Sequence, residues 1–187
     1  GANFSYDIYD GLSFKTNLGL DYRQTVQERS IYPGSHAGVA VQQGNQGSYN
    51  NNVFRRLNLI GTSGLDYHKS FGEHSIAASA LFETIRRRDS EFFYTGYGIN
   101  PKLLNTPAGI TGGTNTNGMI PSVGGAKTQF GMNSYIGLVN YSYADKYTVQ
   151  GTFRRDGSSK LPLVNRWQSF YSIGGNWNAK QEDFLAD

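Results

Sequence analysis

The chain has 187 residues, a formal net charge of +3, and only 37% hydrophobic and 17% charged residues, whereas about 45–50% and about 25% are typical of globular domains. Its 24 glycines and 13 tyrosines suit extended strands joined by polar loops, and this composition excludes an α-helical or a doubly wound α/β fold. Because the chain has no cysteine, thiolate metal sites, thiol nucleophiles and disulfides are also excluded.

Alternating polar and apolar residues predict a β-hairpin at the start of the chain. In residues 14–24 the apolar side chains share one parity and the polar side chains the other, as in a strand with one polar face. Residues 3–8 alternate in the same way. Between the two segments, Asp10-Gly11 is a signal for a tight turn.

Two long loops are predicted at residues 28–52 and 94–126. Both segments lose the alternation and are rich in Gly, Asn and other polar residues. The second one also contains three of the five prolines. We therefore expect neither segment to be buried.

Two strands are predicted between these loops. The first begins at Arg56, residues 69–73 form a short turn, and the second strand covers about 75–93. Leu81 and Ile85 fall on the polar parity of the second strand. This position indicates either a bulge or an irregular alternation.

The last third of the chain repeats this arrangement. Residues 135–143 and 147–153 are predicted strands that are joined by a short turn at 144–146. After a further loop, aromatic residues mark a seventh strand at about 167–177. The tail at 180–185 is compatible with one turn of helix.

The order of the connections is short, long, short, long, short and medium. In an up-and-down meander alternate connections lie at the same end of the strands, so the short turns share one end and the long loops the other. This asymmetry is typical of outer-membrane barrels, and the strands reach the roughly 9–11 residues that are needed to cross a membrane. A β-sandwich or a soluble barrel shares the alternation but does not predict the sided loops. The predicted fold is an all-β, antiparallel up-and-down meander of about seven strands.

The ten arginines all fall near the predicted long-loop ends of the strands. They either lie at the outer rim of a barrel and pair with headgroup phosphates, or they are solvated charges at the bases of polar loops. No nucleic-acid-binding fold signature accompanies them, so we expect no nucleic-acid partner. The arginines are Arg23, Arg29, Arg55, Arg56, Arg86, Arg87, Arg88, Arg154, Arg155 and Arg166.

The C-terminal third contains an R-x-D-G-S-S segment, an aromatic-rich segment with a Trp near its end, and an E-x-F sequence. The residues are Arg154, Asp156, Gly157, Ser158, Ser159, Arg166, Trp167, Phe170, Trp177, Glu182 and Phe184. This pattern resembles the SusC/RagA family of TonB-dependent outer-membrane transporters, which carries it as a hairpin, a return strand and a turn. We interpret Asp-Gly-Ser-Ser as closing the loop, the two tryptophans as lying at the two membrane interfaces, and the acidic tail as periplasmic.

The resemblance implies active import across the outer membrane of a Gram-negative bacterium. Such transporters form a barrel of about 22 strands around a plug, and they work with a SusD-like surface lipoprotein as a lid and with the TonB complex. Their substrates are oligosaccharides or peptides. Residues 1–187 are then expected to be part of the barrel domain, without the plug and without the segment that contacts TonB, and in contact with outer-membrane lipid.

No enzyme constellation is recognisable, and no cofactor or metal is predicted. The three histidines lack ligand-like spacing. Glu83 and Asp89 could form a carboxylate pair, but nothing in the sequence indicates a pocket around them.

Tyrosines in the predicted long loops are candidates for contacts with substrate or lid, because aromatic rings stack on sugars. The alternative is that they belong to an interfacial girdle or to loop packing. They are Tyr32, Tyr49, Tyr94 and Tyr97. For the chain as a whole, a passive porin, a siderophore receptor and a soluble all-β carbohydrate-binding module remain alternative functions.

Overall fold

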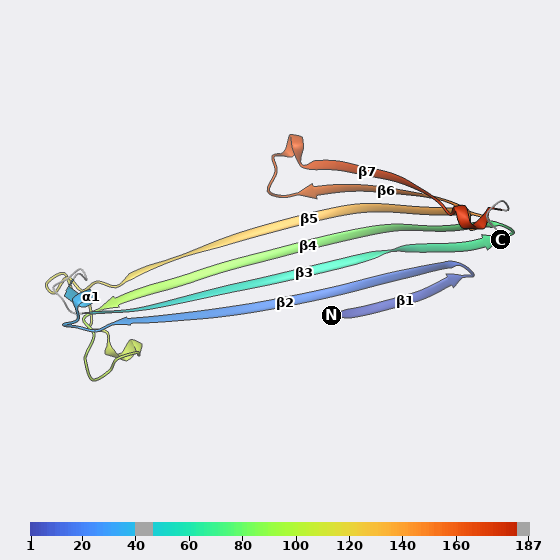
Figure 1. The fold of residues 1–187 in the computed structure, drawn as a ribbon. Coiled ribbons are helices and arrows are strands. Elements are labelled where there is room, and N and C mark those ends of the chain that lie inside the picture. The colour runs from blue at the N-terminus through green and yellow to red at the C-terminus, as the bar shows by residue number, and fades with distance from the viewer. Residues whose placement is uncertain (40–46, 183–187) are drawn as a thin grey trace. The chain divides into compact units, whose positions relative to one another are not determined.

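The computed structural model describes residues 1–39 and 47–182 of the chain. Seven strands form one sheet in which the spatial order is the chain order, β1 to β7 (Figure 1). The recorded pairings of β1 with β2, β5 with β6 and β6 with β7 are antiparallel. The predicted up-and-down meander is therefore confirmed.

The elements differ widely in length. The strands are β1 (Ala2–Tyr9), β2 (Leu12–Ile31), β3 (Ser48–Phe71), β4 (His74–Tyr97), β5 (Ser122–Tyr143), β6 (Tyr147–Ser158) and β7 (Trp167–Trp177). The short helical turns are α1 (His36–Val39), η1 (Pro107–Gly109), η2 (Leu163–Asn165) and η3 (Ala179–Gln181). None of the described helices is long and apolar enough to cross a membrane.

The chain divides into two compact units, which we describe separately. The first unit contains Gly1–Asp21, Asn58–Arg87 and Gln129–Asp187, and the second contains Tyr22–Leu57 and Arg88–Thr128. The three short turns and the hairpin of β6 and β7 belong to the first unit. The connections from β2 to β3 and from β4 to β5 belong to the second.

The short turns have the backbone that their sequences predict. Gly11 and Gly72 have φ values of 80° and 58°, which glycine adopts without steric cost. In the turn from β5 to β6, Ala144 and Asp145 have φ values of 51° and 55°. Two consecutive positive values are typical of the type I′ turn, whose twist matches that of the flanking strands.

The long loops are shorter than the sequence predicts, which corrects the expected ranges 28–52 and 94–126. Strand β2 continues to Ile31 and β3 already begins at Ser48, while β4 continues to Tyr97 and β5 begins at Ser122. The strand ends in the second unit, for example residues 48–52 and 122–126, lack the period-2 pattern of a half-buried strand. Backbone pairing does not need that pattern.

Strand β4 alternates regularly between positions 79 and 83, where the sequence indicates either a bulge or an irregular alternation. Ser79 and Glu83 both contact residues of the polar face, Asp66 and Arg154 respectively. Because these two positions differ by four residues, Leu81 between them shares their face. The sequence therefore has an apolar residue on the polar face and no bulge between positions 79 and 83.

Each face of the sheet in the first unit has its own chemical character. We call the face that carries Lys15, Asp66, Ser79, Glu83, Ser134 and Arg154 the polar face, and the opposite one the apolar face. On the apolar face, Leu20, Tyr171 and Ile173 expose 65%, 87% and 84% of their surface. Exposed apolar side chains that gather on one face in this way are rare on a soluble monomer.

Candidate functional site

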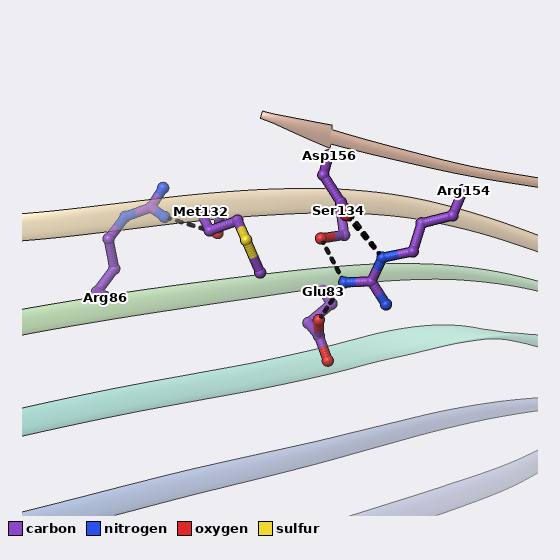
Figure 2. Close-up of polar contacts among 6 residues, drawn as sticks. All are labelled: Glu83, Arg86, Met132, Ser134, Arg154 and Asp156. Atoms are coloured by element: carbon purple, nitrogen blue, oxygen red, sulfur yellow. Dashed lines mark hydrogen bonds and ion pairs between the residues drawn. The ribbon is translucent and has the colours of Figure 1, made fainter. Parts of the chain in front are cut away.

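An ionic cluster around Arg154 lies on the polar face of the first unit. Figure 2 shows the Arg154 side chain reaching from β6 across β5 toward β4. Its Nε donates to both carboxylate oxygens of Asp156, at 2.8 and 2.9 Å, and its Nη2 donates to Glu83 Oε1 at 3.2 Å and to Ser134 Oγ at 3.1 Å. Ser134 is fully buried. Three adjacent strands are thus joined through one guanidinium.

The strand register explains why these residues meet. Ser134 of β5 lies directly opposite Asp156 of β6, and Ile136 lies opposite Arg154. Side chains on one face of neighbouring antiparallel strands are close enough to interact. With one guanidinium and two carboxylates, the cluster carries a net charge of −1 at neutral pH.

Further polar contacts extend along the polar face of the first unit. Lys15 Nζ lies 3.1 Å from Asp66 Oδ2, and Ser79 donates a hydrogen bond to the same carboxylate. Asn58 donates to Asp21 at 3.1 Å. These side chains come from β2, β3 and β4, so cations, carboxylates and amides of several strands share one surface.

The second unit has a similar polar surface. Arg56 Nε donates to Asp89 Oδ1 at 2.9 Å. Asn52 donates to Glu91 at 2.8 Å, and Asn50 donates to Thr95 at 2.9 Å. These cross-strand hydrogen bonds join β3 and β4, and two of the donors, Asn50 and Asn52, lie in the stretch that the sequence predicts to be loop.

Glu83 and Asp89, which the sequence allows as a carboxylate pair, have different partners in the structure. Glu83 bonds Arg154 in the first unit, whereas Asp89 bonds Arg56 in the second. Each carboxylate thus has its own guanidinium partner. Within the described ranges, no group of three or more His, Asp or Glu residues could hold a metal ion.

The Asp-Gly-Ser-Ser motif lies at the end of β6 and at the start of the connection to β7. Asp156, Gly157 and Ser158 continue β6, and the connection to β7 starts at Ser159. A Cβ atom at Gly157 would lie 2.8 Å from the ring of Trp167, so a glycine lets the indole lie against the strand. Ser159 N donates to the Gly131 carbonyl at 2.8 Å and attaches the loop to β5.

An aromatic cluster lies at the loop end of β6 and β7, on the apolar face. The rings of Tyr135 and Trp167 stack at 5.8 Å, and Phe82 lies 5.3 Å from Tyr135. The Arg155 guanidinium lies over the Trp167 ring at 5.5 Å. Arg166, next to Trp167, accepts a hydrogen bond from Ser158 N through its carbonyl at 3.1 Å.

A second cluster lies at the turn end, where the E-x-F motif begins. Glu182 accepts hydrogen bonds from the Tyr147 hydroxyl and from Trp177 Nε1, the latter at 3.1 Å, and its other oxygen lies 3.4 Å from Lys146 Nζ. These donors lower the pKa of the Glu182 carboxyl, the Tyr147 hydroxyl most and Trp177 next. Phe184 lies outside the described residues.

The two tryptophans mark the two ends of β7. The strand has 11 residues, which at about 3.3 Å a residue is about 33 Å along the strand. For a strand tilted by about 40°, as barrel strands are, this length corresponds to a height of about 25 Å, the height of the apolar band of a barrel. Phe170 lies between the two tryptophans in β7, opposite Arg154 in the register of β6 and β7.

The four candidate tyrosines, all in the second unit, have different surroundings. Tyr49 is 1% exposed in β3 and its ring lies 6.1 Å from that of Tyr94, so it is not accessible for stacking on a ligand. Tyr94 and Tyr97 are half-buried near the end of β4. Tyr32 follows β2 and is 51% exposed.

Sequence reasoning missed Glu83 and Ser134 as members of the Arg154 cluster. Alternation places each of them on the polar face, but it does not reveal which residue of another strand lies beside it. Arg154 and Glu83 are 71 positions apart. Only the register of β4, β5 and β6 brings them together.

The known proteins to which the chain is similar in sequence are TonB-dependent receptors. No family model matches it. It is 32% identical over 190 residues to TonB-dependent receptor P3 of Formosa agariphila, covering 100% of the chain and 18% of that relative. It is 44% identical over 54 residues to TonB-dependent receptor SusC of Bacteroides thetaiotaomicron, covering 29% of the chain and 5% of that protein.

Solved structures share the fold. The RagAB peptide transporter matches 98% of the chain and 20% of its own chain, with a TM-score of 0.82 and 20% identity. BauA, the ferric preacinetobactin receptor from Acinetobacter baumannii, matches 92% of the chain and 26% of its own, with a TM-score of 0.51 and 14% identity. The chain therefore spans about a fifth of the length of the first relatives that it matches.

Proposed function

Because the chain belongs to the SusC/RagA family of TonB-dependent receptors, we propose that it forms part of the wall of an outer-membrane importer of oligosaccharides or peptides. TonB-dependent receptors are outer-membrane β-barrels. In this proposal the apolar face of the first unit contacts lipid, and the polar face lines the lumen. Import draws on the TonB complex through other parts of the barrel protein.

The observation that carries the proposal is the separation of the two faces. Leu20, Tyr171 and Ile173 are exposed on one face, and Arg154 and Glu83 lie on the other. Barrel strands alternate between lipid-facing apolar and lumen-facing polar residues in this way. An ionic cluster on the lumen side keeps the path hydrated, because charged groups retain water.

The strand lengths support a membrane band in the first unit. Strands β6 and β7 have 12 and 11 residues, close to the roughly 9–11 residues of a tilted spanning strand. Strands β3 and β4 have 24 residues each, about twice that number. We propose that their additional residues, which lie in the second unit, extend beyond the lipid.

We propose a SusD-like surface lipoprotein as the partner of this extension. The two long connections belong to the second unit, and the exposed Tyr32 lies in one of them. Long loops on a rigid strand scaffold are the usual position for binding residues. The substrate or the lid would then contact the second unit.

The likeness to BauA keeps a siderophore receptor as the second candidate. Its TM-score of 0.51 is lower than the 0.82 of the RagAB peptide transporter. A soluble carbohydrate-binding module is disfavoured by Ile173, which is 84% exposed.

Uptake by cells that carry the full-length receptor tests the proposal. Labelled oligosaccharides, labelled peptides and a ferric siderophore are offered to cells with and without TonB. We expect uptake of an oligosaccharide or a peptide that stops without TonB, and a surface lipoprotein that copurifies with the receptor. Uptake that persists without TonB indicates a passive porin, and uptake of the ferric siderophore alone indicates a siderophore receptor.

A further inference from the structure

The apolar face of the first unit contains a groove. It has a volume of about 460 Å³ and is lined by Phe14, Leu65, Ala80, Phe82, Gly137 and Phe153, among others. Because Gly137 lacks a side chain and Ala80 has a short one, neighbouring large side chains stand above them as walls. The lining offers no charged side chain, so the groove suits a hydrocarbon chain.

The aromatic cluster closes one end of this groove. Phe82 and Tyr135 line the groove, and Trp167 stacks on Tyr135 on the side of the loop end. Aromatic rings with a polar edge are enriched where hydrocarbon meets headgroups. The aromatic cluster therefore marks the level at which the acyl chain of a lipid in the groove would end and its headgroup would begin.

Arg86 lies just beyond this boundary in β4. It follows Phe82 by four residues and therefore shares its face, about 13 Å further along the strand. Its Nη1 donates to the Ile85 carbonyl at 2.9 Å. It also donates to the Met132 carbonyl at 3.2 Å (Figure 2). Gly131 leaves room beside the guanidinium, because a Cβ there would lie 3.3 Å from Nη1. Among the described residues, Nε and Nη2 of Arg86 have no hydrogen-bond acceptor, so their donors remain available.

Arg155 holds a second guanidinium at the same end. It lies opposite Tyr135 in the register of β5 and β6, and over the ring of Trp167 at 5.5 Å. Stacking on an aromatic ring fixes a guanidinium without using its donors. Arg155 thus also presents a positive charge with free donors.

The charges on the two faces are arranged differently. On the polar face, Arg154 and Lys15 each lie within 3.2 Å of a carboxylate. Among the described residues, no carboxylate lies within 4.0 Å of Arg86 or Arg155. The apolar face therefore presents cations that lack a protein counter-ion, at the edge of an apolar groove.

We propose that the groove, Arg86 and Arg155 bind a phosphorylated lipid of the outer leaflet. An acyl chain lies in the groove, the aromatic cluster contacts the glycerol or sugar region, and phosphate oxygens accept hydrogen bonds from the two guanidinium groups. Guanidinium and phosphate form the strong, charge-assisted type of hydrogen bond. The site rests on the proposed orientation of the apolar face toward lipid.

Lipid binding to the purified, delipidated full-length receptor tests this site. The probes are phosphorylated lipid A, its dephosphorylated form and inorganic phosphate, titrated in detergent and measured by native mass spectrometry. We expect the phosphorylated lipid to bind at least about tenfold more tightly than the dephosphorylated form. Equal affinity for both lipids would overturn the proposal.

Charge variants test the headgroup part. The double variant Arg86→Gln/Arg155→Gln should weaken binding of the phosphorylated lipid about tenfold or more and leave the dephosphorylated lipid unaffected. Lys69→Gln is the control. Lys69 is an exposed cation in β3 that lies at the short-turn end of the strand, away from the loop end where Arg155 lies. A double variant that binds like the Lys69→Gln control refutes the proposal.

Groove variants distinguish a lipid from a free phosphate. A Cβ at Gly137 or at Gly151 meets nothing within 4 Å, so a side chain can leave the backbone at either position without a clash. Of the two, only Gly137 lines the groove. Gly137→Leu should weaken lipid binding, whereas Gly151→Leu should not. If inorganic phosphate competes with the lipid and Gly137→Leu changes nothing, the site binds phosphate and not lipid. Uptake assays on the same variants separate this result from a failure of the proposed transport function.

Discussion

Arg154 and Asp156 stand two residues apart in β6, and the Arg154 Nε donates to both carboxylate oxygens of Asp156, at 2.8 and 2.9 Å. Residues at this spacing lie on the same face of a strand. The same guanidinium still reaches Glu83 of β4. The cross-strand ionic cluster thus explains the Arg and the Asp of the R-x-D-G-S-S motif. The glycine of the motif, Gly157, is explained by the Trp167 indole that lies against it.

Removing the guanidinium should destabilise the barrel. Arg154→Met leaves the carboxylates of Asp156 and Glu83 without their shared cation, and we expect a loss of about 1–2 kcal/mol in unfolding free energy, since the pair is partly exposed. The measurement is urea unfolding of the full-length receptor. Lys15→Met is the control and should cost less, because the Lys15 side chain is 55% exposed. Equal losses for both variants would contradict a special role for Arg154.

A side chain at Gly157 should displace Trp167. The added Cβ of Gly157→Ala would lie 2.8 Å from the indole ring, and overpacking of this kind costs about 1–3 kcal/mol. Gly151→Ala is the matched control in the same strand, because a Cβ there meets no atom within 4 Å. Thermal unfolding of both full-length variants measures the difference. If Gly157→Ala is as stable as Gly151→Ala, the indole does not require the glycine.

The period-2 pattern predicts the strand order and the face of most residues in the first unit, because one face there is apolar. In the second unit the pattern fails at Asn50 and Asn52, which hydrogen-bond across to β4 from a segment that is rich in Asn and lacks the alternation. Their sequence is therefore indistinguishable from that of a loop. The Arg154 cluster is only half predictable, since the motif contains Arg154 and Asp156 but the partner Glu83 depends on the register of distant strands.

The contacts of Glu182 should make the turn end of the barrel sensitive to acid. Hydrogen bonds from Tyr147 and Trp177, together with Lys146, lower the pKa of the Glu182 carboxyl. A lowered pKa in the folded state means that the stabilisation is fully present above the unfolded value of about 4.3. It is lost as the pH falls through the folded pKa.

Comparison of the full-length receptor with its Glu182→Gln variant measures this effect. The unfolding midpoint in urea is determined between pH 7 and pH 3. We expect the wild type to be the more stable protein at pH 7, and the difference to shrink below about pH 4 as the carboxylate is protonated. A difference that stays constant over the whole range would show that the charge of Glu182 is not involved.

The candidate tyrosines should divide into structural and accessible positions. Tyr49 is 1% exposed and lies against Tyr94, so Tyr49→Ala should destabilise the second unit by about 3 kcal/mol through the cavity it leaves. Tyr32 is 51% exposed, and Tyr32→Ala should leave stability unchanged. If Tyr32 contacts substrate or lid, its variant lowers uptake or lipoprotein affinity in the full-length receptor. Tyr94→Ala and Tyr97→Ala complete the series, and unchanged uptake and lid affinity in these variants would remove both residues from the binding surface.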